Sequence, residues 1–442
     1  MELTEASEKP LWNQLKDLAD SSTRLFIKKL SRNDTSWADD PDKHQAGFYI
    51  PSDVRESGYF PPLVSDNPAK PHILRAPCPS LWPQTGEIKA SNMRHYSNKG
   101  PETHFTIVPR EVFRGLHPGS LLVSGRLREP VGEAVHYWFL VFDSESDESE
   151  LLETALELPS DFRFGLFEPT AINDAARFES DELEELIEKI DHALRTGTLD
   201  RFVADVAALP SPGELAAQAR AHYLMSTGEP DLDPFRLEAP GDAIMKISRD
   251  IEYAIFRRYE LRRRAAEIVK ILVEENRGIT DAVVRRFQSL DAVFLSASQQ
   301  RKTRAGRSFE FHIAAVLTDG KIRFEEQPIT GGRRPDFVLP DLRTLKRGDR
   351  TEADALVVAA KTTLRDRWKG LSGEALRCHI YLATVDDRVM TPVIDELARD
   401  GITLVVPESL KASKDCFYEE HPNAISFKEL LVGRIGVKMR KT

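Results

Sequence analysis

The last third of the chain alternates short apolar segments with helical ones, and this alternation restricts the possible folds more than any other feature. Five segments have the length and composition of strands: KIRFEEQPI, PDFVLP, ALVVAAKTT, CHIYLATV and ITLVVP. Helical periodicity marks three further stretches, residues 308–317, 366–377 and 392–400. A helix, a hairpin and then alternating strands and helices predict an α/β core with a central mixed sheet.

Residues 44–142 have a different pattern, in which short apolar runs are interrupted by Pro and Gly. The clearest runs are HQAGFYIP, GYFPPLV, THFTIVP, SLLVSGRL and HYWFLVF. Strands of about five residues separated by turn signals indicate a small β-barrel or sandwich. Residues 143–191 then hold 17 acidic and 3 basic residues, which predicts a solvated connector with helical stretches.

The net charge of −10 for 442 residues does not exclude nucleic acid as a partner, because the acidic segment alone accounts for it. No apolar run approaches the roughly 18 residues of a membrane span, and the amino terminus does not resemble a signal peptide. The three cysteines form neither a disulfide framework nor a zinc-site spacing. We therefore expect two or three globular domains in a reducing cytoplasm, with no membrane partner.

Two basic segments can contact DNA phosphates or lie in solvent. In the predicted helix of residues 247–275, one face is apolar (Ile251, Ile255, Tyr259, Ala266), and five arginines occupy the remainder: Arg257, Arg258, Arg262, Arg263 and Arg264. The solvated interpretation is favoured there. The run 301–307 contains four basic residues and no acid, which suits phosphate binding or a solvated loop: Arg301, Lys302, Arg304 and Arg307.

Asp336 begins one predicted strand, and Lys361 ends the next strong strand. Adjacent strands would place the carboxylate and the ammonium at the same edge of the sheet. A carboxylate can hold Mg²⁺, and a neighbouring lysine can orient an attacking water and stabilise charge on a phosphate. A structural pair without catalytic function is the alternative, although a charge at the end of an apolar strand is costly without a partner.

Arg365, Asp366 and Arg367 form a triplet at the start of a predicted helix. Arginine is the favoured bidentate partner of guanine, and a carboxylate can accept a hydrogen bond from cytosine N4. Such a triplet in the major groove can read two guanines and their paired cytosines, which make one half-site. An ordinary surface ion-pair cluster would look similar.

Five segments resemble the EcoRII-like type II (type IIE) restriction endonucleases of the PD-(D/E)XK superfamily: SRNDTSWADDPDKHQAGFYIPS, RKTRAGRSFEFH, QPITGGRRPDF, AKTTLRDRW and GITLVVPESL. The chain departs from the superfamily pattern at Ala359, where a second acid usually stands two residues before the lysine. In one branch that acid comes from the following helix, at the position of Glu374. The resemblance implies an amino-terminal β pseudobarrel, an acidic linker and a restriction-endonuclease-like domain.

The resemblance implies that Asp336, Lys361 and Glu374 are catalytic, with Glu310 supporting the site. Mg²⁺ would be held by Asp336, Glu374 and Glu310. The triplet would read CC and GG flanks, and extrusion of the central bases would favour an A·T centre, giving CCWGG.

The resemblance divides the chain into an effector domain (1–160), a linker (161–205) and a catalytic domain (206–442). The effector domain would hold a second double-stranded DNA site through five residues: His44, Tyr49, Arg94, Lys99 and Glu102. Without that site the domain would be autoinhibitory, and the acidic segment 143–191 would assist by docking on residues 301–307. A homodimer through the catalytic domain follows from a palindromic target. A cognate cytosine methyltransferase would be the functional partner in a prokaryotic host.

Two other functions remain open. One is a DNA-binding regulator whose nuclease domain has lost activity, and the other is a repair or modification-sensing nuclease. The complete trio Asp336, Lys361 and Glu374 argues against the first, because loss of activity would be expected to remove at least one member.

Overall fold

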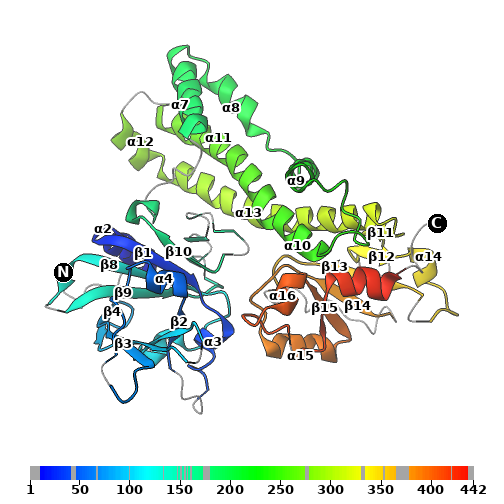
Figure 1. The fold of residues 1–442 in the computed structure, drawn as a ribbon. Helices are drawn as coiled ribbons and strands as arrows, with labels where there is room; N and C mark the ends of the chain where they lie inside the picture. Colours follow the sequence, from blue (N-terminus) through cyan, green and yellow to red (C-terminus); the bar gives the residue numbers. More distant parts are fainter. Residues whose placement is uncertain are drawn as a thin grey trace. The chain divides into compact units, whose positions relative to one another are not determined.

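The structure is a computed structural model of the 442-residue chain. It describes the following residues: 10–40, 46–65, 68–98, 100–132, 134–146, 148–149, 152–153, 156, 158–159, 162–172, 180–273, 278–329, 334–351, 354–364, 378–419 and 421–436. The chain divides into two compact units (Figure 1). The first comprises Met1–Arg177, Asp387–Met390 and Lys414–Phe417, and the second comprises the remainder.

The first unit contains two β-sheets. The larger has the order β10-β1-β8-β9-β4-β5, with these bounds: β10 Phe164–Phe167, β1 Ser22–Lys29, β8 Leu121–Val131, β9 Val135–Phe142, β4 Ser80–Trp82 and β5 Glu87–Lys89. The smaller is β2-β7-β6-β3, formed by β2 Phe48–Ile50, β7 Thr103–Thr106, β6 Asn92–Tyr96 and β3 Ile73–Pro77. Short helices accompany the sheets: α2 Leu11–Asp20, α3 Arg32–Thr35, α4 Ser52–Glu56, α5 Arg110–Phe113 and the 3₁₀ helix η1 Pro169–Ile172.

Strand β9 explains why the run HYWFLVF is apolar at nearly every position. Side chains alternate between the faces of a strand, and here both faces are buried. Tyr137 and Phe139 join an aromatic core that also contains Phe48 and Phe105 of the smaller sheet. Trp138, Leu140 and Phe142 point to the opposite face, where they pack with α2. The six-stranded sheet is therefore the central layer of this unit.

Glycine is required where β8 passes the Trp138 side chain. A Cβ atom at Gly125 would lie 2.3 Å from the indole ring, which is too close for any other residue without displacement of the ring. The indole Nε1 donates a hydrogen bond to Ser22 Oγ at 2.9 Å. Gly125 thus allows a fully buried tryptophan to lie across the neighbouring strand.

Two expectations for this unit are corrected. GYFPPLV forms no strand, since only Val64 makes an isolated bridge, to Arg75, and its two prolines lack the N–H groups that a ladder needs. Strand β10 lies inside the predicted linker but pairs antiparallel with β1. The β-structure therefore extends beyond residue 160.

The second unit contains a six-stranded mixed sheet of order β11-β12-β13-β14-β15-β16. Its strands are β11 Glu325–Glu326, β12 Phe337–Leu339, β13 Leu356–Ala360, β14 Ile380–Ala383, β15 Ile402–Val406 and β16 Ala424–Ser426. β12 pairs antiparallel with β13, and β13 to β16 are parallel. The predicted α/β core with a mixed sheet is confirmed, including the pairing of strands predicted within 355–363 and 378–385.

Helices cover both faces of this sheet and extend away from it. They are α7 Ser180–Arg195, α8 Leu199–Ala207, α9 Pro212–Thr227, α10 Pro240–Met245, the π-helical η2 Lys246–Ile251, α11 Glu252–Val273, α12 Ile279–Arg285, α13 Phe287–Asp319, α14 Leu342–Leu345, α15 Thr391–Arg399, α16 Glu408–Ala412 and the π-helical η3 Glu429–Ile435. The carboxy-terminal half of α13 packs on one face against Val358 and Tyr381, while α15 contacts β15. α7, α8, α11 and α12 lie beside one another away from the sheet (Figure 1).

Tertiary packing overrides two expectations about the basic segments. Arg264 is only 9% exposed, and its guanidinium bonds to Glu267 and Gln300, so the solvated interpretation is wrong for this residue. Arg263 also pairs with Glu267. The run 301–307 belongs to the 33-residue helix α13 and is not a loop.

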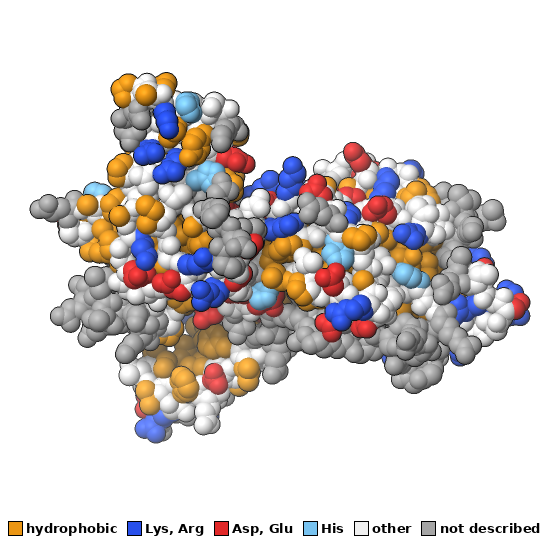
Figure 2. Space-filling view, turned by 90° about the horizontal axis from the view of Figure 1, so that it is seen from below, with side chains coloured by type: hydrophobic (Ala, Val, Ile, Leu, Met, Phe, Trp, Pro, Cys, Tyr) orange, Lys and Arg blue, Asp and Glu red, His pale blue; other side chains and the backbone are white. Residues whose placement is uncertain are grey.

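Among the described residues, one face of the molecule shows no division by charge. On the face seen in Figure 2, acidic and basic side chains lie close to one another with hydrophobic ones between them. No helix among the described residues is long and apolar enough to span a membrane.

Candidate functional site

Two charged side chains meet at one edge of the mixed sheet in the second unit. Asp336 immediately precedes β12, and Lys361 immediately follows β13. Asp336 Oδ2 accepts hydrogen bonds from Lys361 Nζ at 3.1 Å and from the Ala360 amide at 2.8 Å. The antiparallel register, with Phe337 opposite Val358, brings these strand ends together. The structure thus places the carboxylate and the ammonium side by side, as their positions in the sequence predict.

Helix α13 brings a second carboxylate to this edge. Glu310 is half-buried, and its Oε2 accepts a hydrogen bond from Gln327 Nε2 at 2.7 Å. Gln327 is in turn fixed by its own backbone, whose N–H donates to the carbonyl of Asp336 at 2.9 Å. No periodicity or charge pattern marks Gln327, although it lies in the segment QPITGGRRPDF. Its role depends on a contact with a helix 17 residues earlier in the chain.

The two carboxylates influence each other electrostatically. Burial raises the pKa of Glu310, and the negative charge of Asp336 raises it further. The hydrogen bond from Gln327 and the positive charges of Lys361 and Arg307 act in the opposite direction. The carboxylates of Asp336 and Glu310 therefore lie close together in a partly desolvated place, where a cation would be favourable.

Several predicted site residues lie outside the described residues. Glu374 and the triplet Arg365, Asp366 and Arg367 belong to this group, as do His44 and Lys99 of the first unit. Arg301 and Arg304 lie in α13, but their side chains are not described. The roles of these residues, and the docking of the acidic segment on 301–307, stay predictions.

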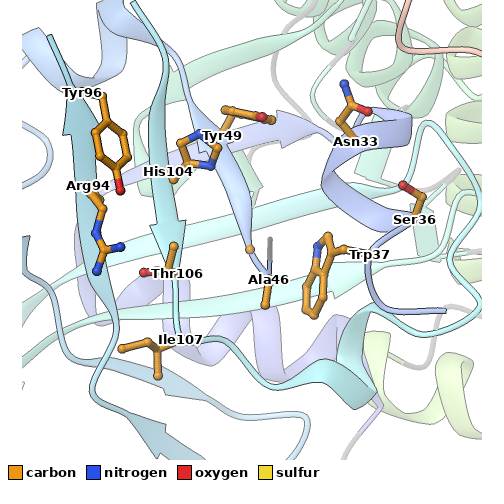
Figure 3. Close-up of a pocket in the computed structure, with 11 residues that line it drawn as sticks. Asn33, Ser36, Trp37, Ala46, Tyr49, Arg94, Tyr96, His104, Thr106 and Ile107 are labelled. Atoms are coloured by element: carbon orange, nitrogen blue, oxygen red, sulfur yellow. The ribbon is translucent and has the colours of Figure 1, made fainter. Parts of the chain in front are cut away.

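The first unit contains an open cavity of about 910 Å³ over its smaller sheet (Figure 3). Tyr49 of β2, His104 of β7 and Arg94 of β6 lie in one row across the sheet, because Tyr49 pairs with His104 and His104 with Arg94. The rings of Tyr49 and His104 are 4.3 Å apart. Arg94 Nε has no hydrogen-bond partner among the described residues. The cavity thus combines a stacking surface with a cationic donor.

Two predicted contact residues, Tyr49 and Arg94, line this cavity, while Glu102 is exposed beside β7 and does not line it. Burial lowers the pKa of His104, the positive charge of Arg94 acts in the same direction, and the charges of Glu102 and Asp34 oppose both. The neutral form of the His104 ring is therefore favoured.

Asp34 holds one wall of the cavity in place. It is fully buried, and its Oδ2 accepts hydrogen bonds from Lys28 Nζ at 2.6 Å and from the backbone and hydroxyl of Ser31. Its Oδ1 accepts the amide of Tyr49 at 2.8 Å, and its carbonyl accepts Trp37 Nε1 at 2.7 Å. One carboxylate therefore joins β1, the start of α3 and β2. α3 contributes Asn33 to the lining of the cavity, and its C-cap residue, Ser36, also lines it.

Residues 266–431 match the protein family described as EcoRII C terminal. The chain is 28% identical over 443 residues to the type II restriction enzyme EcoRII of Escherichia coli, and 95% of each chain is covered. It is also 28% identical over 149 residues to the type II restriction enzyme SsoII of Shigella sonnei, covering 31% of this chain and 47% of that one.

The chain is thus homologous to type II restriction enzymes, which are site-specific deoxyribonucleases. The resemblance to EcoRII-like enzymes inferred from the sequence is confirmed. A solved structure, metal-depleted Ecl18kI in complex with uncleaved DNA, matches 54% of this chain and 83% of its own, with 21% identity and a TM-score of 0.46.

The donor set at this edge of the mixed sheet fits a hard divalent cation. Carboxylate oxygens are the ligands that Mg²⁺ prefers, and Asp336 and Glu310 supply them at one place. Among the described residues no three acidic, His or Cys side chains form a cluster, and the third predicted ligand, Glu374, lies outside them. The chemistry of the two described carboxylates fits the metal that the family resemblance implies.

The raised pKa of Glu310 predicts a pH dependence of metal binding. A protonated carboxyl is a poor ligand, so affinity for a divalent cation should fall as the pH drops through the raised pKa of Glu310. Titration with Mn²⁺, followed by electron paramagnetic resonance at several pH values, measures this affinity without cleavage. Glu310→Gln should bind more weakly and show a smaller dependence on pH. An unchanged pH dependence in this variant would show that another group governs metal binding.

Proposed function

We propose that the chain is a type II restriction endonuclease that cuts both strands of DNA at CC/GG-flanked sites, using Mg²⁺ held at the sheet edge. The observation that carries this proposal is the contact of Asp336 with Lys361, beside Glu310. Paired carboxylates and an adjacent ammonium suit hydrolysis of a phosphodiester bond.

Asp336, Glu310 and Glu374 would hold the metal. When bound, a divalent cation supplies positive charge that stabilises the additional negative charge of the phosphate in the transition state. Lys361 Nζ already donates to Asp336, at 3.1 Å, and to the carbonyl of Ala360, at 2.9 Å, so its position is fixed before DNA binds. From there the ammonium can donate to an attacking water or to a phosphate oxygen. In-line attack would leave a 5′-phosphate end.

Specificity is proposed to reside in Arg365, Asp366 and Arg367, which follow Lys361 closely in the sequence. Two arginines can each bind one guanine through two hydrogen bonds, and the aspartate can accept from cytosine. A central A·T pair is easier to open than G·C if the central bases leave the stack, which favours CCWGG.

The first unit is proposed to bind a further copy of the site and so to activate cleavage allosterically. Support comes from the cavity that contains the Tyr49–His104 ring pair and Arg94, since aromatic rings and an arginine suit nucleic acid. In the absence of a second site, this effector domain would be autoinhibitory. The predicted linker 161–205 would connect it to the catalytic domain, although β10 pairs within the first unit and α7 and α8 belong to the second.

The catalytic domain is proposed to form a homodimer, because a palindromic site needs one triplet per half-site. Helices α12 and α13 carry an exposed apolar face suited to this contact. Phe287 and Phe294, seven residues apart on α13, are 65% and 62% exposed, and Leu295 is 58% exposed. Side chains at this spacing share one face of a helix, and exposed phenylalanines on a helix mark association surfaces.

Phe294→Asp is expected to convert the dimer to a monomer, because a carboxylate would have to be buried in an apolar contact. Sedimentation velocity at micromolar concentration measures the change. Met225→Asp is the matched control, since Met225 is 79% exposed on α9, which is a different helix. Equal sedimentation of both variants and the parent protein would place the dimer contact elsewhere.

Digestion of plasmids that carry one or two candidate sites, followed by sequencing of the ends, tests the function. We expect Mg²⁺-dependent double-strand cuts at CCWGG with 5′-phosphate ends. Addition of a short duplex containing the site should accelerate cleavage of the single-site plasmid. DNA binding without cleavage at any site would favour an inactive regulator, and cleavage only of methylated DNA would favour a modification-sensing nuclease. A cognate cytosine methyltransferase should protect the site.

A further inference from the structure

The segment between Lys361 and Leu364 joins the cleavage site to the triplet proposed to read the bases. The backbone ladder between β13 and β14 ends when the amide of Lys361 donates to the carbonyl of Ala383 at 3.0 Å. Beyond that point, the side chains of Thr384 and Asp386, which follow β14, bind the backbone of the segment after Lys361. Thr384 Oγ1 donates to the carbonyl of Thr362 at 3.3 Å, and Asp386 Oδ2 accepts the amide of Leu364 at 2.9 Å.

Asp386 is itself held firmly. Its side chain and backbone are buried, with 6% of the residue exposed. Its amide donates to Thr384 Oγ1 at 3.1 Å, and its carbonyl accepts the hydroxyl of the fully buried Tyr418. A buried carboxylate is costly unless its oxygens accept hydrogen bonds. The bond to the Leu364 amide therefore constrains Leu364, which is 3% exposed, as well as stabilising Asp386.

We propose that Asp386 is a positioning residue for base recognition, which fixes the backbone of Leu364, the residue that precedes the triplet Arg365, Asp366 and Arg367 in the sequence. This inference rests on the proposed function, because it assigns the triplet to base reading. Arg365 is one peptide unit beyond Leu364, about 3.8 Å between Cα atoms. A bidentate arginine contact tolerates only a few tenths of an ångström in each hydrogen bond. A fixed Leu364 amide therefore limits the displacement of the residue that precedes the triplet.

Thr384 also helps to hold this segment, through a bond to the residue that follows Lys361. Its hydroxyl both donates to Thr362 and accepts the amide of Asp386, so it connects the two anchors. Loss of either anchor would release the segment after Lys361 without removing a group that touches DNA or metal. Loss of an anchor should therefore reduce the preference for CCWGG over altered sites more than it reduces metal affinity.

The test compares full-length Asp386→Ala, Asp386→Asn and the parent protein. The readout is the ratio of kcat/KM for a CCWGG duplex to that for a duplex with one altered flanking base pair. Asp386→Ala should lower this ratio by about tenfold or more, which corresponds to loss of one good base contact. Asp386→Asn keeps an oxygen that can accept the Leu364 amide, so most of the discrimination should remain. Mn²⁺ affinity should be unchanged in both.

Asp400→Ala serves as the control, since Asp400 is exposed just after α15 in the same unit. If Asp386→Ala lowers cleavage of both duplexes by the same factor, Asp386 has only a structural role and the proposal is wrong. If this variant does not fold, Thr384→Val tests the same attachment, and an unchanged ratio in that variant overturns the proposal. Failure of the proposed function can be told apart from failure of this inference, because the parent protein itself would then show no preference for CCWGG.

Discussion

Asp336→Asn is expected to reduce DNA cleavage by about three orders of magnitude or more, because it removes the negative charge of a proposed metal ligand, worth several kcal/mol in the transition state. The carboxylate also accepts hydrogen bonds from Lys361 and the Ala360 amide. An asparagine can accept through one oxygen, but its NH₂ group would repel the ammonium. Single-turnover cleavage of a CCWGG duplex measures the loss.

DNA affinity in the presence of Ca²⁺ should change little in this variant, since Asp336 is not proposed to contact bases. The control is Asp349→Asn, in which the same chemical change affects an exposed residue paired with Arg347. Substantial cleavage by Asp336→Asn would remove Asp336 from the metal site, and equal losses in both variants would indicate a general effect of lost negative charge.

Asp34→Asn is expected to destabilise the first unit by roughly 3–5 kcal/mol, the usual cost of breaking a buried ion pair by removing one partner. The carboxylate lies between Lys28 and the amide of Tyr49, with no exposed surface. The variant would leave the ammonium of Lys28 buried without its counter-ion. An asparagine has one acceptor oxygen in place of two, so the attachment of α3, which contributes Asn33 to the cavity, to β1 and β2 would be weakened.

Tryptophan fluorescence during urea unfolding measures this effect, because four of the five tryptophans lie in the first unit: Trp12, Trp37, Trp82 and Trp138. The midpoint should shift to lower urea concentration. Asp39→Asn is the control, since Asp39 is exposed and an amide oxygen can still accept the Gly115 amide. An unchanged midpoint in Asp34→Asn would mean that the network around α3 contributes little to stability.

The α/β core and the meeting of Asp336 with Lys361 were predictable from the sequence for a local reason. Each residue adjoins a short apolar strand, and strands that follow one another usually pair. The pairing of β12 with β13 then places the two charges at one edge. The apolar run of β9 likewise predicts a strand, because alternation along a strand is a local property.

The partners of helical and loop residues were decided only by the tertiary structure. Arg264 lies in a basic sequence that suggests exposure, yet α11 packs against α13 and brings Gln300 within hydrogen-bonding distance. Gln327 and Asp386 show no pattern of their own, and their functions arise from contacts with Glu310 and Leu364. A sequence determines which residues can form an element, whereas burial and hydrogen-bond partners depend on segments far apart in the chain, which periodicity does not record.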